Sequence, residues 1–223
     1  MGGGSAPSLT AWERRTLDRS LDDARQRALG KGHRFLQAAG EIMIETGGLA
    51  FTIQDLAERS QLSLGSFYKA FSGKEELLLA LFEESVVLGV SMQASVIADI
   101  ADPLEQLEAC LTWLAAPRAL LGEEDNPGAR ALAELRFTLA SSRPADLARA
   151  LEPQLQILND VLQRAVANGQ VRNDIPARRL AEMVWAVAAE ANHNSILRTG
   201  ILDDAEAPGN VWEFCRSALL MHA

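Results

Sequence analysis

The chain contains few side chains that could catalyse a reaction. Its three histidines, His33, His193 and His222, lie far apart in the sequence, and its carboxylates are scattered rather than clustered. No glycine-rich phosphate loop, H-E-x-x-H motif or G-x-S-x-G motif is present. The two cysteines, Cys110 and Cys215, form no C-x-x-C pair. We therefore predict no enzymatic activity, no metal site and no cofactor.

The segment 52–77 has the spacing of a helix-turn-helix unit. Thr52 and Ser63 are residues of a type that caps helix N-termini, and each precedes a short run with apolar residues on one face. Ser72-Gly73-Lys74-Glu75 has the S-x-x-E pattern of a capping box and opens a longer helix. Two short helices closed by a third can place the second helix in the major groove of DNA. That helix starts with Ser63-Leu64-Gly65-Ser66, and the small residues among these permit close approach of its backbone to DNA.

Charge is distributed unevenly along the chain. The formal net charge of −9 is unusual for a protein that binds nucleic acid. Residues 1–80, however, hold 10 Lys+Arg and 10 Asp+Glu, whereas residues 81–223 hold 11 and 20. DNA phosphates repel an acidic surface, so contact with DNA is predicted through the N-terminal part only.

The elements that position these residues are predicted to be helices throughout. Alanine and leucine dominate, strand-like alternation is weak, and proline is absent between Ser8 and Asp102. Helices are expected over 10–46, from 52, from 63, and over 73–98, 102–116, 129–141, 144–168, 176–199 and 210–221. The predicted fold class is all-α. Residues 1–9 are predicted to form a flexible tail, 10–80 a three-helix DNA-binding domain with an N-terminal helical extension, and 81–223 a larger helical domain.

The segment 52–77 also resembles the signature of the TetR family of transcriptional regulators. The resemblance rests on Leu56-Ala57, Ser63, Phe67-Tyr68-Lys69-Ala70-Phe71 and Ser72-Gly73-Lys74-Glu75-Glu76-Leu77. It extends back to Ala38-Ala39 and Gly48 and covers about 45 residues. Gln61 stands where the family usually has the turn glycine, so we predict a non-glycine residue with a positive φ there.

The resemblance implies a role for each matching residue. Tyr68 and Lys74 are expected to contact DNA phosphates, and Thr52 and Ser63 to cap helices close to the DNA backbone. The side chains expected to face the groove are Gln54, Leu64, Gly65, Ser66 and Lys69. The alternatives from the residues alone are ordinary packing for Tyr68 and a solvated surface for the two lysines.

The role of residues 10–34 stays open at the level of sequence. This segment is rich in arginine but has interleaved aspartates. It fits a contact with DNA, and it fits equally a solvated helix with ion pairs four residues apart, such as Asp23–Arg27.

The resemblance further implies a ligand pocket and a dimer interface in residues 81–223. Apolar residues surround most of the segment 176–199, which is typical of a helix buried on two sides. We predict a homodimer through 176–199 and 210–221, with a central helix of a monomer as the alternative. An apolar ligand is expected to bind beside Trp113, Phe137, Met183, Trp185, Asn192 and His193, for which core packing is the alternative.

Together these patterns predict a cytoplasmic, sequence-specific regulator of transcription with no membrane partner. Its expected partners are a palindromic double-stranded DNA operator and an unknown small molecule. The protein is expected to act as a repressor that this small molecule releases from the operator. The alternative function is a helical protein-interaction module that keeps the fold without binding DNA. A salt-dependent mobility shift with the chain's own upstream DNA separates the two functions.

Overall fold

The computed structural model describes residues 10–115, 126–202 and 204–220, with residues 11 and 13–18 described by their backbone alone. These residues form helices and no strand, as the sequence predicted. One compact unit comprises the chain up to Ala39 together with Phe51–Leu77. The other comprises Gly40–Ala50 and the chain from Leu78 onward.

The first unit is built on aromatic packing among three helices: α1 (Ala11–Thr46), α2 (Ile53–Ser60) and α3 (Leu64–Ala70). Phe67 of α3 is fully buried, with its ring edge-on to that of Phe35 of α1 at a centroid distance of 5.3 Å. Phe71 lies on the other side of Phe67, at 5.6 Å. Because edge-to-face pairs add to the free energy of burial, these rings hold α3 against α1 at a defined angle.

Local hydrogen bonds set the ends of α2 and α3. The Thr52 hydroxyl accepts from the Asp55 N–H while the Asp55 carboxylate accepts from the Thr52 N–H, which confirms the predicted cap at Thr52 and makes it a capping box. The Ser63 hydroxyl accepts from the Ser66 N–H at the start of α3, which confirms that cap as well. Gln61 ends α2 with φ 55° and ψ 37°, the left-handed conformation predicted for it.

The predicted cap of the next helix differs in one residue. Helix α4 (Lys74–Ile97) begins at Lys74, and the Ser72 N–H donates to the carboxylate of Glu76 rather than Glu75, at 2.6 Å. The S-x-x-E pattern therefore identified the helix start correctly and the accepting side chain wrongly.

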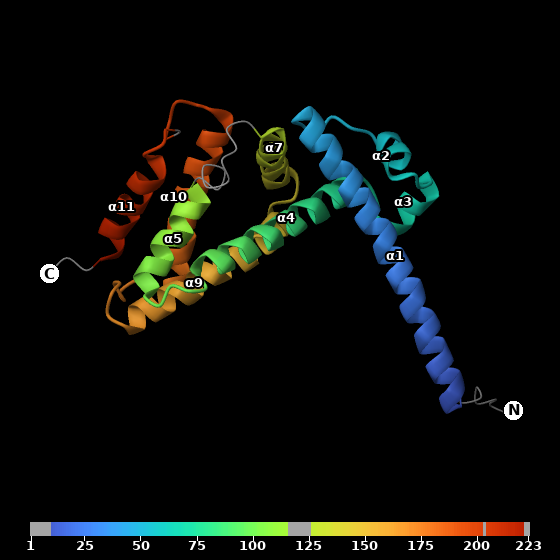
Figure 1. Ribbon diagram of the computed structural model, residues 1–223, viewed down its shortest axis with the longest axis horizontal. Coiled ribbons are helices and arrows are strands. Elements are labelled where there is room, and N and C mark those ends of the chain that lie inside the picture. The colour runs from blue at the N-terminus through green and yellow to red at the C-terminus, as the bar shows by residue number, and fades with distance from the viewer. Residues whose placement is uncertain (1–9, 116–125, 203, 221–223) are drawn as a thin grey trace, which may run out of the picture. The chain divides into compact units, whose positions relative to one another are not determined.

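The second unit packs helices around α10 (Ala177–Leu197). It contacts α5 (Pro103–Ala115), α9 (Glu152–Ala167) and α11 (Ala207–Leu219) (Figure 1). α7 (Pro127–Ser142), α8 (Pro144–Ala150), α4 from Leu78 onward and the end of α1 from Gly40 onward also belong to this unit. The core is aliphatic, and its fully buried members include Leu107, Leu111, Leu158, Leu162 and Ala188.

The single helix predicted over 144–168 is wrong, because the structure divides it into α8 and α9 at Leu151. Pro153 occupies the first turn of α9. A proline within a continuous helix has no N–H to donate and its ring clashes with the carbonyl four residues earlier. The chain avoids both costs by starting a new helix just before Pro153.

A buried chain of amides joins three helices of the second unit. The Gln93 side chain of α4 is fully buried, and its Nε2 donates to the Cys110 carbonyl of α5 at 3.1 Å. Gln154 of α9 donates to the Gln93 Oε1 at 2.7 Å. Each polar group left unpaired in such a core costs about 1–3 kcal/mol, so these bonds fix which helices pair.

Helix α4 is long enough and apolar enough, by length and composition alone, to cross a membrane. Glu83 and Glu84 lie near its middle, where charged groups are costly in hydrocarbon. The core helices of proteins that fold in water pass the same test, so its composition is weak evidence for a membrane span.

Candidate nucleic-acid interface

The N-terminal end of α3 is exposed, while its opposite face anchors it to the core. Leu64 is 42% exposed, and a Cβ added to Gly65 would meet only the Ser63 hydroxyl, at 3.9 Å. The backbone at the start of α3 therefore lies open to a large partner. The structure places Ser63, Leu64, Gly65 and Ser66 together on this surface, as their spacing predicted.

Tyr68 projects from α3 with 59% of its surface exposed. Its ring lies edge-on to Phe67 at a centroid distance of 5.4 Å, so the base of the side chain is supported by the core. Within the part of the chain that the structure describes, the Tyr68 hydroxyl makes no hydrogen bond. It is a positioned donor on the surface of α3, the geometry that a phosphate contact requires.

Lys74 is held within the domain. Its ammonium donates to the Phe51 carbonyl at 2.5 Å and lies 4.2 Å from the centroid of the Phe51 ring. Lys74 thus ties the start of α4 to the residue that precedes the α2 cap. An ammonium has three donors, so this anchoring orients Lys74 without excluding a phosphate contact.

Thr52 and Gln54 lie on the exposed side of α2 and are engaged in bonds within it. Hydrogen bonds from the Thr52 N–H and hydroxyl lower the pKa of the Asp55 carboxyl, and they do so more than the charge of Lys74 does. Gln54 Nε2 donates to the Glu58 carboxylate at 2.9 Å, so a contact with DNA would have to replace that bond.

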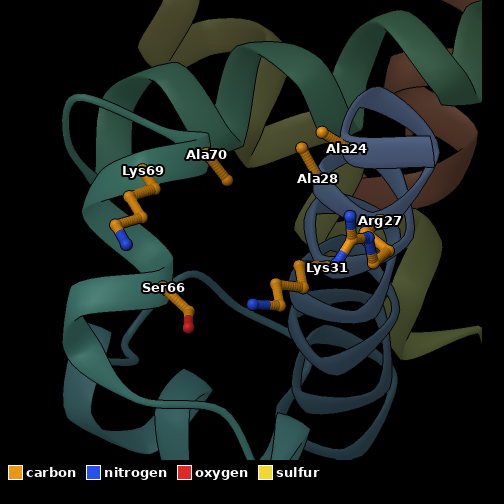
Figure 2. A pocket seen from close by; sticks show the side chains of 7 residues that line it. All are labelled: Ala24, Arg27, Ala28, Lys31, Ser66, Lys69 and Ala70. Carbon is orange, nitrogen blue, oxygen red and sulfur yellow. The ribbon is translucent and has the colours of Figure 1, made fainter. Parts of the chain in front are cut away.

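A cleft that no sequence pattern indicated directly opens between α1 and α3. This α1–α3 cleft has a volume of about 280 Å³ and is lined by Ala24, Arg27, Ala28, Lys31, Ser66, Lys69 and Ala70. Figure 2 shows Arg27 and Lys31 on the α1 wall and Ser66 and Lys69 on the α3 wall. Helical spacing alone places four of these residues on one face of α1, namely Ala24, Arg27, Ala28 and Lys31. It does not show which helix packs opposite that face.

The ion pair considered for Asp23 and Arg27 is not formed. Arg27 Nε donates instead to the backbone carbonyl of Asp23, at 3.1 Å. The arginine therefore keeps its positive charge at the cleft without a carboxylate partner among the described residues.

In the second unit, the six residues predicted for a ligand pocket do not come together. Asn192 and His193 line a hollow of about 220 Å³ between α7 and α10, together with Arg136 and Leu132. Phe137 and Met183 are 70% and 53% exposed, and neither they nor Trp113 and Trp185 line this hollow. Helical spacing located Phe137 and Met183 on their helices but did not show that these faces point outward.

A larger apolar groove adjoins the α7–α10 hollow. It has a volume of about 560 Å³, and its apolar lining comprises Met43, Ile44, Leu81, Leu88 and Leu132. Ala129 and Leu132 line both spaces, so the two lie on either side of this part of α7. The sequence missed this groove because its residues come from three separate helices.

Arg136 supplies a cation at the polar end of these spaces. Its guanidinium lies 5.1 Å from the Trp185 ring centroid. Burial lowers the pKa of Arg136, and the nearby charge of Glu190 acts in the opposite direction. A partly desolvated cation gains stability from an anionic group beside it, so this end of the hollow is suited to an acidic part of a ligand.

The cysteines have no nucleophilic character. Burial raises the pKa of the Cys110 thiol to about 12 and that of Cys215 to about 11. Both thiols are therefore protonated at neutral pH and act as small apolar core residues.

Comparison with known proteins agrees with this geometry. Residues 35–81 match the family model "Bacterial regulatory proteins, tetR family". The fatty acid metabolism regulator protein of Bacillus subtilis is 23% identical over 155 residues, which span 70% of this chain and 78% of that protein.

Solved structures share the fold over most of the chain. FadR from Bacillus subtilis in complex with stearoyl-CoA has a TM-score of 0.66 at 20% identity, covering 85% of this chain and 99% of that one. FadR from Bacillus halodurans also gives 0.66, at 19% identity over 83% and 94% of the two chains. RolR in complex with resorcinol gives 0.65, at 17% identity over 87% and 90%. The chain therefore carries the helix-turn-helix domain of the tetR family of bacterial regulatory proteins, and its fold is that of TetR-family transcriptional regulators.

Proposed function

We propose that the chain is a sequence-specific DNA-binding repressor, released from a palindromic operator by a small, largely apolar ligand. In this proposal residues 10–80 bind DNA in the cytoplasm, and residues 81–223 bind the ligand and form the dimer. The observation that carries it is the exposed start of α3 beside Tyr68, on a helix that Phe67 anchors in the core. Small residues there allow close approach to the groove, and Tyr68 can bind the adjacent backbone.

The ligand proposal rests on the apolar groove and the adjoining α7–α10 hollow. An elongated apolar portion fits beside Met43, Leu81 and Leu132, and an acidic group fits beside Arg136. Asn192 and His193 remain candidate contacts at the polar end. The FadR relative was solved with stearoyl-CoA, so a fatty acyl thioester is the first ligand to test.

The test is a mobility-shift titration with DNA upstream of the chain's own coding sequence and with a scrambled duplex. We expect stronger binding to the upstream DNA, a fall in affinity with salt, and weakened binding when stearoyl-CoA is added. A ligand that couples to DNA binding by about 1–3 kcal/mol weakens it by roughly 5–150-fold. Absence of salt-dependent DNA binding would instead support the protein-interaction module.

A matched pair of variants tests the ligand site. Arg136→Gln removes the cation at the α7–α10 hollow, whereas Arg130→Gln removes an exposed arginine of the same helix that lines neither space. We expect stearoyl-CoA to release DNA from the Arg130→Gln variant at wild-type concentrations and from Arg136→Gln only at higher ones. Equal responses would exclude Arg136 from ligand recognition.

A further inference from the structure

Helix α1 extends far beyond the part that the helix-turn-helix core requires. It begins at Ala11, whereas the family match begins at residue 35. At 1.5 Å per residue, the additional residues form a rod of about 36 Å. Residues 19–31 are all exposed, so packing within the described structure does not account for this segment.

Between residues 24 and 31, one face of α1 is basic and free of carboxylates. Ala24, Arg27, Ala28 and Lys31 follow one another at spacings of three and four residues and line the α1–α3 cleft. With about 100° of rotation per residue, Asp22 and Asp23 lie roughly 160° and 100° from Ala24 around the helix. Neither of these two aspartates lines the cleft.

The facing wall adds a third cation. Lys69 and Ser66 line the α3 side of the α1–α3 cleft, and Ala24, Ala28 and Ala70 keep it open because their side chains are small (Figure 2). Among the side chains that the structure describes, no carboxylate lines the cleft. Among the described residues, Lys31 and Lys69 make no ion pair, and Arg27 bonds only to a backbone carbonyl. The lining of the cleft is therefore positively charged, which favours an anion as its occupant.

We propose that the α1–α3 cleft binds a backbone phosphate of double-stranded DNA, with Arg27 and Lys31 on one side and Lys69 on the other. This inference rests on the proposed function. A recognition helix in a major groove about 12 Å wide has a phosphate backbone along each side. Since α1 forms the other wall of the cleft beside α3, its extension lies over one of these backbones. The extension therefore enlarges the phosphate-binding surface beyond the helix-turn-helix core.

The test compares neutralised cations on two faces of the same helix. Arg27→Gln, Lys31→Gln and the double variant remove charge from the cleft. Arg25→Gln, about 100° from Ala24 around the helix, is the matched control. For each protein, affinity for the upstream DNA and for a random-sequence duplex is measured as a function of salt concentration.

Affinity falls as salt concentration rises, and the steepness of this fall on a log–log plot is called the salt slope here. Each cleft substitution is expected to make the salt slope less steep by about 0.9 per subunit, on both DNAs. The control is expected to leave the slope at its wild-type value. Circular dichroism and the thermal midpoint are expected to stay unchanged, because these side chains are exposed. An unchanged slope in the double variant, or an equal fall in Arg25→Gln, would overturn the inference.

Two further outcomes are decisive. Inorganic phosphate could stabilise the wild-type protein against heat in the absence of DNA, and the double variant could lose this stabilisation. If the salt slope of the double variant is also unchanged, the cleft is a site for a free anion instead. A changed oligomeric state in the double variant, with an unchanged slope, would assign the basic face to contact with a second copy of the chain. If the wild-type protein shows no salt-dependent DNA binding, the proposed function fails before the cleft is tested.

Discussion

At the scale of single residues, Lys74 combines a structural and a proposed functional role. Its ammonium is fixed by the Phe51 carbonyl and ring. Lys74→Ala is expected to weaken binding to operator and scrambled DNA alike and to lower the salt slope by about 0.9 per subunit. It should also destabilise the domain by about 1–3 kcal/mol, because a charge-assisted hydrogen bond and a cation–π contact are lost.

Salt titrations and chemical denaturation measure the two effects of the Lys74→Ala substitution separately. Lys74→Arg, which keeps the charge, is the control and should retain the salt slope. Loss of stability in Lys74→Ala with an unaltered salt slope would restrict Lys74 to its structural role.

Tyr68 offers a contrasting change that leaves charge untouched. Tyr68→Phe removes a hydroxyl that has no partner among the described residues, so the thermal midpoint should stay the same. DNA binding should weaken on both operator and scrambled DNA with little change in the salt slope, because a neutral donor releases no counterion. Wild-type affinity in Tyr68→Phe would show that the exposed hydroxyl does not contact the DNA.

Lys69 was predicted to face the groove, and the structure places it on the α3 wall of the α1–α3 cleft. The two positions give different results for Lys69→Ala. A contact in the cleft predicts equal loss of affinity on all DNA sequences and a lower salt slope. An altered preference among operator variants in a binding-site selection would identify base contact instead.

At the scale of elements, Gln61 sets the angle between α2 and α3 at a cost in strain. A non-glycine residue in the left-handed region is disfavoured by about 1–2 kcal/mol. Gln61 adopts φ 55°, so Gln61→Gly is expected to stabilise the protein by about 1 kcal/mol after the extra freedom of the unfolded chain is subtracted. Gln61→Ala keeps the strain and serves as the control. If Gln61→Gly proves less stable than Gln61→Ala in thermal denaturation, the turn is unstrained.

At the scale of the whole molecule, the property to measure is the association of two copies of the chain into a dimer. α10 and α11 pack on each other and expose large apolar side chains, Met183 and Phe214, which are 53% and 64% exposed. We proposed a dimer through these helices, because it would cover such residues and give a two-fold protein for a palindrome. The half-sites of that operator would lie about 34–36 Å apart, or a multiple of this distance.

Phe214→Ser is expected to shift sedimentation from dimer toward monomer at micromolar concentration and to weaken operator binding. The same substitution at Phe137, which is exposed on α7, is the control and should leave association unchanged. A monomeric wild-type protein would contradict the proposed interface.

The sequence by itself determined the features that depend on neighbouring residues. The caps at Thr52 and Ser63 and the left-handed Gln61 follow from hydrogen bonds and backbone conformations spanning only a few positions. The four-residue spacing of Phe67 and Phe71 places both on one helical face, and both are buried. Such local patterns sufficed for the all-helical fold and for the helix-turn-helix.

Only the tertiary structure decided which faces meet. Periodicity shows that a helical face is apolar or basic, but it does not show what that face packs against. It therefore placed Phe137 and Met183 in a pocket, although both lie on the surface. It also did not reveal that Lys74 binds Phe51, or that Arg27 and Lys31 face Lys69 across a cleft. These contacts join residues more than 20 positions apart, and their geometry depends on how whole helices pack around Phe35 and Phe67.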